Sequence, residues 1–369
     1  MNKLIHACLA AVLSVFILTT GVFGEKVSTD IINAGVGARP LGMGKAFTAL
    51  ADDSNAIFLN PAGLGYQTNW ELTSLSSRIL NSVDYRMVGA AMPTALGTVG
   101  VGYLTTSSGA GFSTSTENVG GVDQVIPVSQ ISYRQDVAYL SLGRKLNENL
   151  SAGVGVKMQA QSFAGATSAQ ATGYNTDLSL LWKVNNSLSL GINSQNALSY
   201  AGSNISWSTG EKEKGESRIK IGGALRPNPQ LVLALDSELS GASSGLLFHG
   251  GAEYKPVSFV SLRLGVDQNS AAAGGGSYST VNNLTGGVGI EFYGAKFDYA
   301  YYRVADYSEN STHYFSISFS GVQDGLFTSQ AKTEIKQAVS DQKLKNVVLD
   351  IPDGMNKSGL YSEAGRDLL

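Results

Sequence analysis

The pentapeptide Gly241–Gly245 and two histidines are the residues of this chain whose types could support catalysis. The pentapeptide, GASSG, matches the G-x-S-x-G pattern that carries the nucleophilic serine of many hydrolases. Such a serine needs a turn between a strand and a helix, with a histidine base beside it. GASSG instead connects two predicted strands, and His249 and His313 each fall within a predicted strand. We therefore interpret the match as accidental and expect the protein not to be an enzyme.

Residues for cofactor chemistry are equally scarce. The only cysteine, Cys8, lies in an apolar N-terminal segment that we expect to be removed, so the mature chain would have no thiol. No cluster of histidines and cysteines has the spacing of a transition-metal site, and no G-x-x-x-x-G-K-[ST] loop is present to bind a nucleotide. The formal net charge of −3 argues against a nucleic-acid partner. We expect no cofactor, no metal ion and no nucleic acid.

The N-terminus has the features of a secretory signal peptide. Lys3 supplies the positive charge, residues 4–18 form the apolar stretch, and residues 19–24 supply small residues. We expect cleavage after Gly24, which makes residues 1–24 the signal peptide. No later segment approaches the roughly 18 consecutive apolar residues that a transmembrane helix needs. If the exported protein crosses a membrane, it would therefore do so without a transmembrane helix.

Composition and turn spacing indicate a transmembrane β-barrel. Charged residues are 15% of the chain, against roughly 25% in soluble domains, and there are 44 glycines but only 8 prolines. After the third apolar run, two-residue gaps alternate with longer gaps, as the short and long connections of outer-membrane barrels do. The period-two runs predict fourteen strands: 70–79, 83–93, 97–106, 131–146, 149–162, 172–184, 187–196, 216–226, 229–239, 245–255, 258–267, 281–292, 295–303 and 312–320.

Within these runs, apolar and polar residues alternate. In the run 149–162, one face carries Leu150, Val154 and Val156 while the other carries Ser151 and Lys157. The apolar face should contact lipid and the polar face should line the lumen. We therefore predict an all-β, fourteen-stranded antiparallel barrel over residues 70–321, located in the bacterial outer membrane with that lipid as its partner. An even number of strands places both chain ends in the periplasm.

Two segments lie outside the predicted strands. Residues 25–69 are too apolar for a free tail, so we expect them to form a hatch inside the lumen, with a short helix over 45–51. Residues 322–369 follow the last strand and could include a polar helix over 328–345. We expect this C-terminal part to be a solvated periplasmic tail, although it could also dock a partner.

The stretch 37–65, GARPLGMGKAFTALADDSNAIFLNPAGLG, resembles the N-terminal signature of the FadL/TodX superfamily of outer-membrane transport proteins, and its GARxLGMG form is closest to the PorV/PorQ-like branch. The resemblance implies a fourteen-stranded barrel closed by an N-terminal hatch, which agrees with the strand count above. It also implies transport of hydrophobic compounds or, in secretion members, delivery or retention of exported proteins. The matching residues are Gly42, Met43, Gly44, Ala46, Phe47, Ala51, Asp52, Asp53, Asn60, Pro61 and Ala62.

The residue types of this motif suit a backbone that is folded without regular structure. Gly42 and Gly44 permit unusual dihedral angles or close backbone contacts. Asp52 and Asp53 could cap the short helix or accept hydrogen bonds from lysines and arginines of the lumen. Asn60 precedes proline, which keeps it out of the helical region, and its amide can pair with backbone groups. The motif could therefore serve only to hold the hatch in place, or it could also contact a ligand.

Two functions remain open at this point. The first is passive transport of hydrophobic or amphipathic small molecules, with Phe47, Phe58 and Leu59 of the hatch as ligand contacts or gate. The second is an accessory barrel that binds proteins of a secretion system through its outer loops or C-terminal tail. A purely structural surface barrel is a third option.

Overall fold

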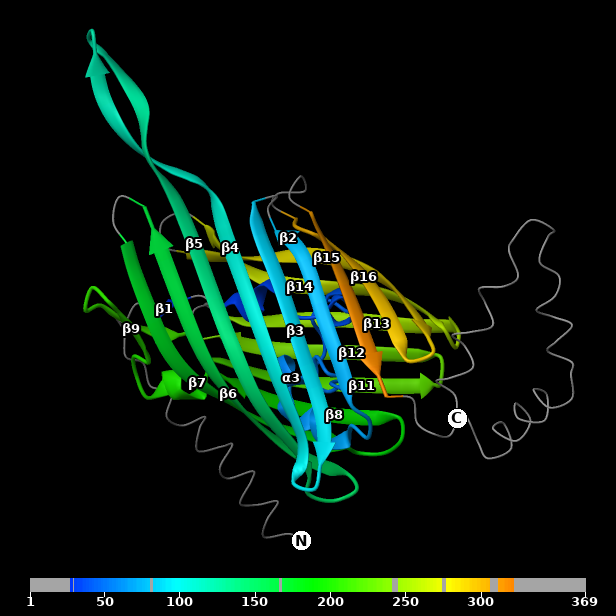
Figure 1. Cartoon of the computed structure of the whole chain (residues 1–369). Helices are drawn as coiled ribbons and strands as arrows, with labels where there is room; N and C mark the ends of the chain where they lie inside the picture. Colours follow the sequence, from blue (N-terminus) through cyan, green and yellow to red (C-terminus); the bar gives the residue numbers. More distant parts are fainter. Residues whose placement is uncertain are drawn as a thin grey trace, which may run out of the picture. The chain divides into compact units, whose positions relative to one another are not determined.

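A closed barrel of antiparallel strands forms the protein (Figure 1). The computed structural model describes residues 27–28, 30–79, 82–165, 168–240, 245–273, 277–305 and 311–321. Fourteen strands in this described part make up the wall, as predicted: β2 Glu71–Ile79, β3 Val83–Thr94, β4 Gly97–Val119, β5 Val122–Lys145, β6 Leu150–Ala164, β7 Ser168–Lys183, β8 Leu188–Gln195, β11 Arg218–Asn228, β12 Leu231–Ser240, β13 Leu246–Val257, β14 Val260–Ala273, β15 Ser277–Phe292, β16 Ala295–Arg303 and β17 Thr312–Ser320.

Two pairings close the ring. The last strand, β17, pairs with the first, β2, and β8 pairs with β11 across an insertion between them. The insertion contains the 3-10 helix η3 (Ala197–Tyr200) and the short strands β9 (Ile205–Trp207) and β10 (Lys212–Gly215), of which β9 extends the pairing of β7. A parallel two-residue pairing joins β10 to β1 (Val27–Ser28).

The outer face of the wall is apolar and the inner face is polar, in the predicted register. Lys157 is buried in the lumen, whereas its neighbours Val156 and Met158 are exposed on the outside. Other exposed side chains follow the same alternation on other strands: Val88, Leu140, Leu264, Ile290 and Phe297. A barrel with this exterior fits a bilayer. Among the described residues, no helix is long and apolar enough to cross a membrane.

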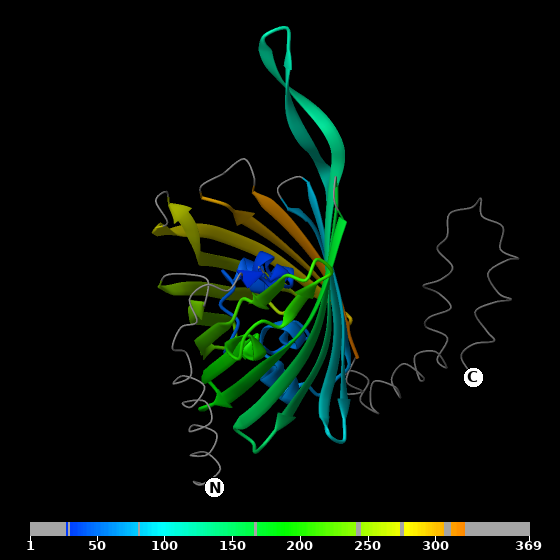
Figure 2. The ribbon, with the colours of Figure 1, turned by 90° about the vertical axis from the view of Figure 1, so that its left-hand side faces the viewer.

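The predicted long loop 107–130 is instead a continuation of two strands. β4 and β5 stay paired from Thr98 with Gly143 to Val119 with Val122, and the two strands project beyond the rest of the wall (Figures 1 and 2). Residues 107–118 are mostly glycine, serine and threonine, and the apolar residues that follow do not alternate regularly at period two: Val119, Val122, Val125, Ile126 and Val128. The apolar periodicity that defined the other strands therefore stops before the pairing does. The projecting hairpin is exposed along most of its length.

The hatch lies inside the ring of strands, as Figure 2 shows in blue. It consists of η1 (Ile31–Ala34), α2 (Ala38–Gly42), α3 (Ala56–Leu59) and η2 (Pro61–Tyr66), joined by turns. The predicted helix over 45–51 is wrong, because consecutive turns replace it there. Gly44 and Lys45 have φ angles of 61° and 63°, which a right-handed helix does not allow. The expected signal peptide 1–24 and tail 322–369 lie outside the described residues, as do Gly241–Ser244 of the GASSG motif.

Candidate functional site

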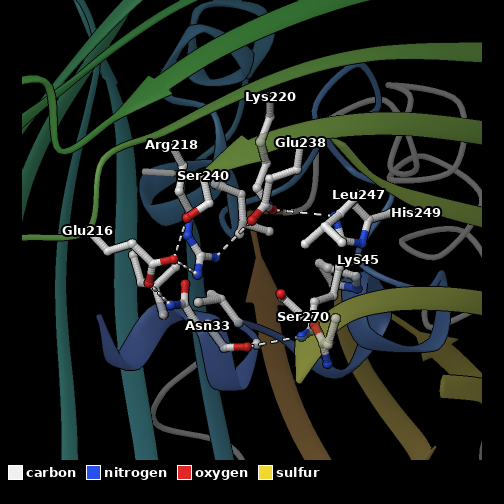
Figure 3. Close-up of a pocket in the computed structure, with 16 residues that line it drawn as sticks. Asn33, Lys45, Glu216, Arg218, Lys220, Glu238, Ser240, Leu247, His249 and Ser270 are labelled. Carbon is white, nitrogen blue, oxygen red and sulfur yellow. Dashed lines mark hydrogen bonds and ion pairs between the residues drawn. The ribbon is translucent and has the colours of Figure 1, made fainter. Parts of the chain in front are cut away.

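A cavity of about 400 Å³ lies between the hatch and the wall at the end of the barrel where the long connections are found (Figure 3). We call it the long-loop cavity. The hatch contributes Ile32, Val36, Pro40 and Leu59 to its lining, and Lys45 and Asn33 as polar groups. The wall side comprises the ends of four neighbouring strands, β11 to β14, together with Glu216 just before β11: Glu216, Arg218, Lys220, Glu238, Ser240, Leu247, His249, Asn269 and Ser270.

The charged wall residues of this cavity form a row of ion pairs. Arg218 lies 2.8 Å from Glu216 and 3.2 Å from Glu238, and the Nζ of Lys220 lies 2.7 Å from the other oxygen of Glu238. His249 lies behind the row, with its Nδ1 2.6 Å from Asp267. Antiparallel pairing places Lys220 opposite Glu238 and His249 opposite Asp267, so strand register creates these contacts. The row therefore presents both hydrogen-bond donors and acceptors.

Ion pairs also fasten the hatch to the wall near this cavity. Lys45 of the hatch lies 2.9 Å from Asp267, and Asn33 donates a 2.8 Å hydrogen bond to Glu216. Asp30 lies 3.6 Å from the buried Lys157 and accepts from Asn196. Burial opposes ionisation of Asp30, but Lys157 and Asn196 outweigh it and hold the pKa of this carboxyl below its ordinary value.

A second network fastens the hatch at the end of the barrel with the short turns. Arg39 donates to Glu253 of β13 through Nε at 2.9 Å and Nη2 at 3.1 Å, and its Nη1 donates to Asp52 and Asp53. Glu253 also accepts from Arg263 of β14 at 2.6 Å. Both aspartates thus accept from an arginine of the hatch itself, and only Asp52 also accepts from a wall arginine, Arg226. No helix 45–51 exists for them to cap.

Two more cavities, of about 430 and 490 Å³, lie at the short-turn end. Asp52 and Arg226 line both of them, and their side chains are 3.1 Å apart. Tyr66 lines the larger one, where its ring lies 3.9 Å from the ammonium of Lys183. Burial raises the pKa of the Tyr66 hydroxyl to about 12, so this ring stays neutral at physiological pH. The hatch thus separates one cavity at the long-loop end from two at the short-turn end.

The Asn60-Pro61-Ala62 segment holds the middle of the hatch together. The Asn60 side chain donates to the carbonyl of Thr48 at 2.6 Å and accepts from the backbone N–H of Ala62 at 3.1 Å. Its φ of −159° is extended, as expected before proline. Ser151 and Ser179 of the wall bind the carbonyl and the N–H of Ala62. These contacts seat the hatch, and none of the three residues lines a cavity described here.

Close backbone contacts explain the glycines of the motif. Gly44 has a positive φ, and a Cβ at this position would lie 2.5 Å from the carbonyl oxygens of Gly250 and Val266. Gly42 packs against Gly287, where a Cβ would be 3.3 Å from the Gly287 Cα. Both glycines therefore let the hatch backbone lie directly on the wall.

Of the three hydrophobic residues predicted as ligand contacts or gate, Leu59 lines the long-loop cavity. Phe47 is buried under the guanidinium of Arg39, 5.5 Å from its ring centre, and lines none of the three cavities. Phe58 is also fully buried and makes an edge contact with Tyr139 at 5.0 Å. The two phenylalanines therefore pack the hatch rather than face an open cavity.

The wall residues that complete these networks were not among the predicted site residues. They are charged residues on polar faces of predicted strands, and this placement was their only signal: Lys220, Asp236, Glu238, Glu253, Arg263 and Asp267. Asp236, for example, accepts hydrogen bonds from the backbone N–H groups of Phe47 and Thr48. His313, in contrast, is exposed, and its Nδ1 lies 2.9 Å from the hydroxyl oxygen of Tyr299.

No protein-family model matches the chain, and no curated protein sequence matches it significantly. Solved structures do match. The toluene transporter TbuX of Ralstonia pickettii aligns with a TM-score of 0.55 at 15% identity, over 78% of this chain and 97% of that chain. The toluene transporter TodX of Pseudomonas putida gives 0.54 at 14%, over 78% and 98%. CymD, a monoaromatic hydrocarbon channel, gives 0.53 at 13%, over 79% and 98%.

The chain has their barrel fold. At these identities the similarity establishes architecture, and it confirms the fourteen-stranded antiparallel barrel that the sequence predicts. The structures it resembles are described as transporters and channels rather than enzymes.

Proposed function

We propose that the protein is a passive channel of the bacterial outer membrane for hydrophobic or amphipathic small molecules. The observation that carries this proposal is a hatch with cavities on both of its sides inside a closed barrel. A ligand could occupy the long-loop cavity and pass to the short-turn cavities when the hatch shifts. The shared fold of toluene transporters supports this function, and the buried hatch argues against a wide general porin.

Orientation follows from the connections. Short turns face the periplasm in outer-membrane barrels, so the long-loop cavity would open toward the outside and receive the ligand first. The first and last wall strands, β2 and β17, then begin and end in the periplasm. A signal peptide over residues 1–24 and a periplasmic tail over 322–369 remain part of this proposal.

A reversible cross-link tests whether the hatch must move. A Cβ on Gly42 would lie 3.4 Å from the Cβ of Arg263, close to the spacing of a disulfide. The mature chain has no other cysteine, so Gly42→Cys with Arg263→Cys gives a single bridge. In proteoliposomes, oxidation should lower the flux of a hydrophobic solute relative to the same double variant kept reduced. Arg263→Cys alone, which loses the same ion pairs but forms no bridge, is the control under both conditions, beside the wild-type barrel. Flux that equals that of barrel-free liposomes in the wild type would refute transport.

The projecting β4–β5 hairpin favours a second candidate function, that of an accessory barrel in a protein secretion system. Within the described part of the chain, no strand pairs with the outer edges of this hairpin beyond Ser108 and Ser132, and such edges accept a strand from a partner protein. The PorV/PorQ-like branch would fit this function and stays a prediction. Deletion of residues 110–130 tests it: loss of secretion-system proteins from a pull-down would support a secretion role, and unchanged solute flux would show that the hairpin serves this role independently of transport.

A further inference from the structure

The lining of the long-loop cavity is more polar than that of a purely hydrophobic pocket. None of the described residues that line it is a phenylalanine, tyrosine or tryptophan, and its wall side consists mainly of ionic and polar groups. Its apolar residues come almost entirely from the hatch: Ile32, Val36, Pro40 and Leu59, joined by Leu247 of the wall. Figure 3 shows the charged side chains of the wall gathered on one side of this space. The wall side of the cavity is thus mainly polar, and the hatch side is mainly apolar apart from Asn33 and Lys45.

On the polar face, the positive charges of Arg218 and Lys220 are matched by the carboxylates of Glu216 and Glu238. Arg218 lies between Glu216 and Glu238, and Lys220 and His249 both approach Glu238, at 2.7 and 3.4 Å. Each positive group therefore has a carboxylate beside it. Lys45 is compensated in the same way, because Asp267 lies 2.9 Å from its Nζ.

We infer that this cavity binds a compact amphiphile whose head group has no net charge but both donates and accepts hydrogen bonds, such as a vicinal diol or a zwitterion. The inference rests on the proposed transport function, since it names the substrate class of the same cavity. The head would lie along the row from Glu216 to Lys220, and the apolar body would lie against Ile32 and Leu59. A volume of about 400 Å³ suits a small ligand of this kind.

Other ligand classes fit less well for physical reasons. A plain hydrocarbon would displace water from Arg218 and Glu238 without replacing its hydrogen bonds, which is costly for buried ionic groups. A simple anion would be placed close to the carboxylates of Glu216 and Glu238. A simple cation would be placed close to Arg218 and Lys220. A head with both donors and acceptors meets favourable partners of each kind.

A series of probes that share an eight-carbon chain and differ in the head group tests this inference. The probes are n-octane, octanoate, octylammonium, 1,2-octanediol and 2-aminooctanoate, measured by equilibrium dialysis at neutral pH. The full-length barrel is held in phosphatidylcholine nanodiscs, and binding to empty nanodiscs is subtracted. We expect the diol and the amino acid to bind at least about tenfold more tightly than octane, since hydrogen bonds to charged groups are worth this much.

A paired substitution then tests whether the ion row causes the preference. Lys220→Met together with Glu238→Met removes one charge of each sign and should move the preference toward octane. Glu117→Gln, on the exposed projecting hairpin, is the control and should leave the order of probes unchanged. If the double variant does not fold, the order of probe affinities measured on the wild-type barrel still tests the proposed ligand class.

The outcomes separate this inference from the proposed function. Tightest binding of octane, octanoate or octylammonium, or no specific binding of any probe, would overturn the ligand class whatever the flux measurements show. Tightest binding of the diol or the amino acid supports it. If that order holds but no probe crosses proteoliposomes faster through the barrel, transport fails while the assignment of the cavity's ligand class stands.

Discussion

Arg39 of the hatch and Glu253 of the wall are joined by two parallel hydrogen bonds, at 2.9 and 3.1 Å, although 214 positions separate them in the sequence. Both side chains are buried. The pair links the hatch directly to the wall at the short-turn end. Its geometry matches the forked pairing in which arginine recognises a carboxylate.

Replacing Arg39 by methionine should loosen the hatch. The substitution leaves Glu253 with Arg263 alone and deprives Asp53 of its arginine partner, and breaking a buried ion pair costs about 3–5 kcal/mol. Limited proteolysis of the barrel in detergent should show faster cleavage within residues 30–66. Arg78→Met breaks an exposed pair with Asp84, which is worth about 1 kcal/mol or less, and serves as the control. Equal cleavage in both variants would contradict the fastening role.

A methyl group at Gly44 should prevent the hatch from lying on the wall. Gly44→Ala forces a side chain into a left-handed conformation, which costs roughly 1–2 kcal/mol, and directs its Cβ at two carbonyl oxygens. We expect a lower yield of folded barrel, measured by the mobility shift between unheated and heated samples in gel electrophoresis. Gly111→Ala is the matched control, because the nearest atom to its Cβ lies 3.6 Å away. Normal folding of Gly44→Ala would show that this contact is dispensable.

Acid should release the hatch at the long-loop end. The pKa of Asp30 is below its ordinary value of 3.8 in the folded protein, so the unfolded state takes up its proton first as pH falls. The stabilisation by Asp30 is present above about pH 3.8 and is lost as pH falls through the lower folded value. Lys157, Asn196 and Arg218 stabilise its charged form.

Hydrogen exchange of residues 30–36, followed between pH 6 and pH 3 after correction for intrinsic rates, measures this release. Exchange should rise at the acid end in the wild type. Asp30→Asn lacks the titrating carboxyl, so the acid-dependent rise should be smaller there, starting from faster exchange at pH 6. An identical pH profile in the two proteins would assign the effect to another group.

Filling the long-loop cavity should block the ligand. Leu59 lines this cavity and is only partly buried, so Leu59→Trp would occupy part of its volume. We expect weaker binding and lower flux of whichever probe the wild type prefers, without loss of the folded barrel. Leu72→Trp adds the same side chain on the exposed outer face and should change neither property. Unaltered flux through the Leu59 variant would place the route elsewhere.

The barrel itself was predictable because its signals are local. Alternation at period two is visible within a single strand such as 295–303, where predicted and observed bounds agree. The two-residue turns indicated which strands are neighbours. The apolar composition of the segment before Trp70 predicted that this segment lies in the lumen. The extended pairing of β4 with β5 escaped prediction because its residues carry no apolar periodicity.

Only the tertiary structure decided how the hatch is held and what its cavities are like. Arg39 meets Glu253, and Lys45 meets Asp267, because closure of the ring brings distant segments to the same point in the lumen. Turns at Gly44 and Lys45, rather than the expected helix, follow from the wall that lies against them. Periodicity assigns a residue to the inside of a barrel, but which inward residues face each other depends on strand register and on the path of the hatch. The sequence by itself therefore determined the barrel. Only its closure in three dimensions determined which charged and polar side chains meet in the lumen.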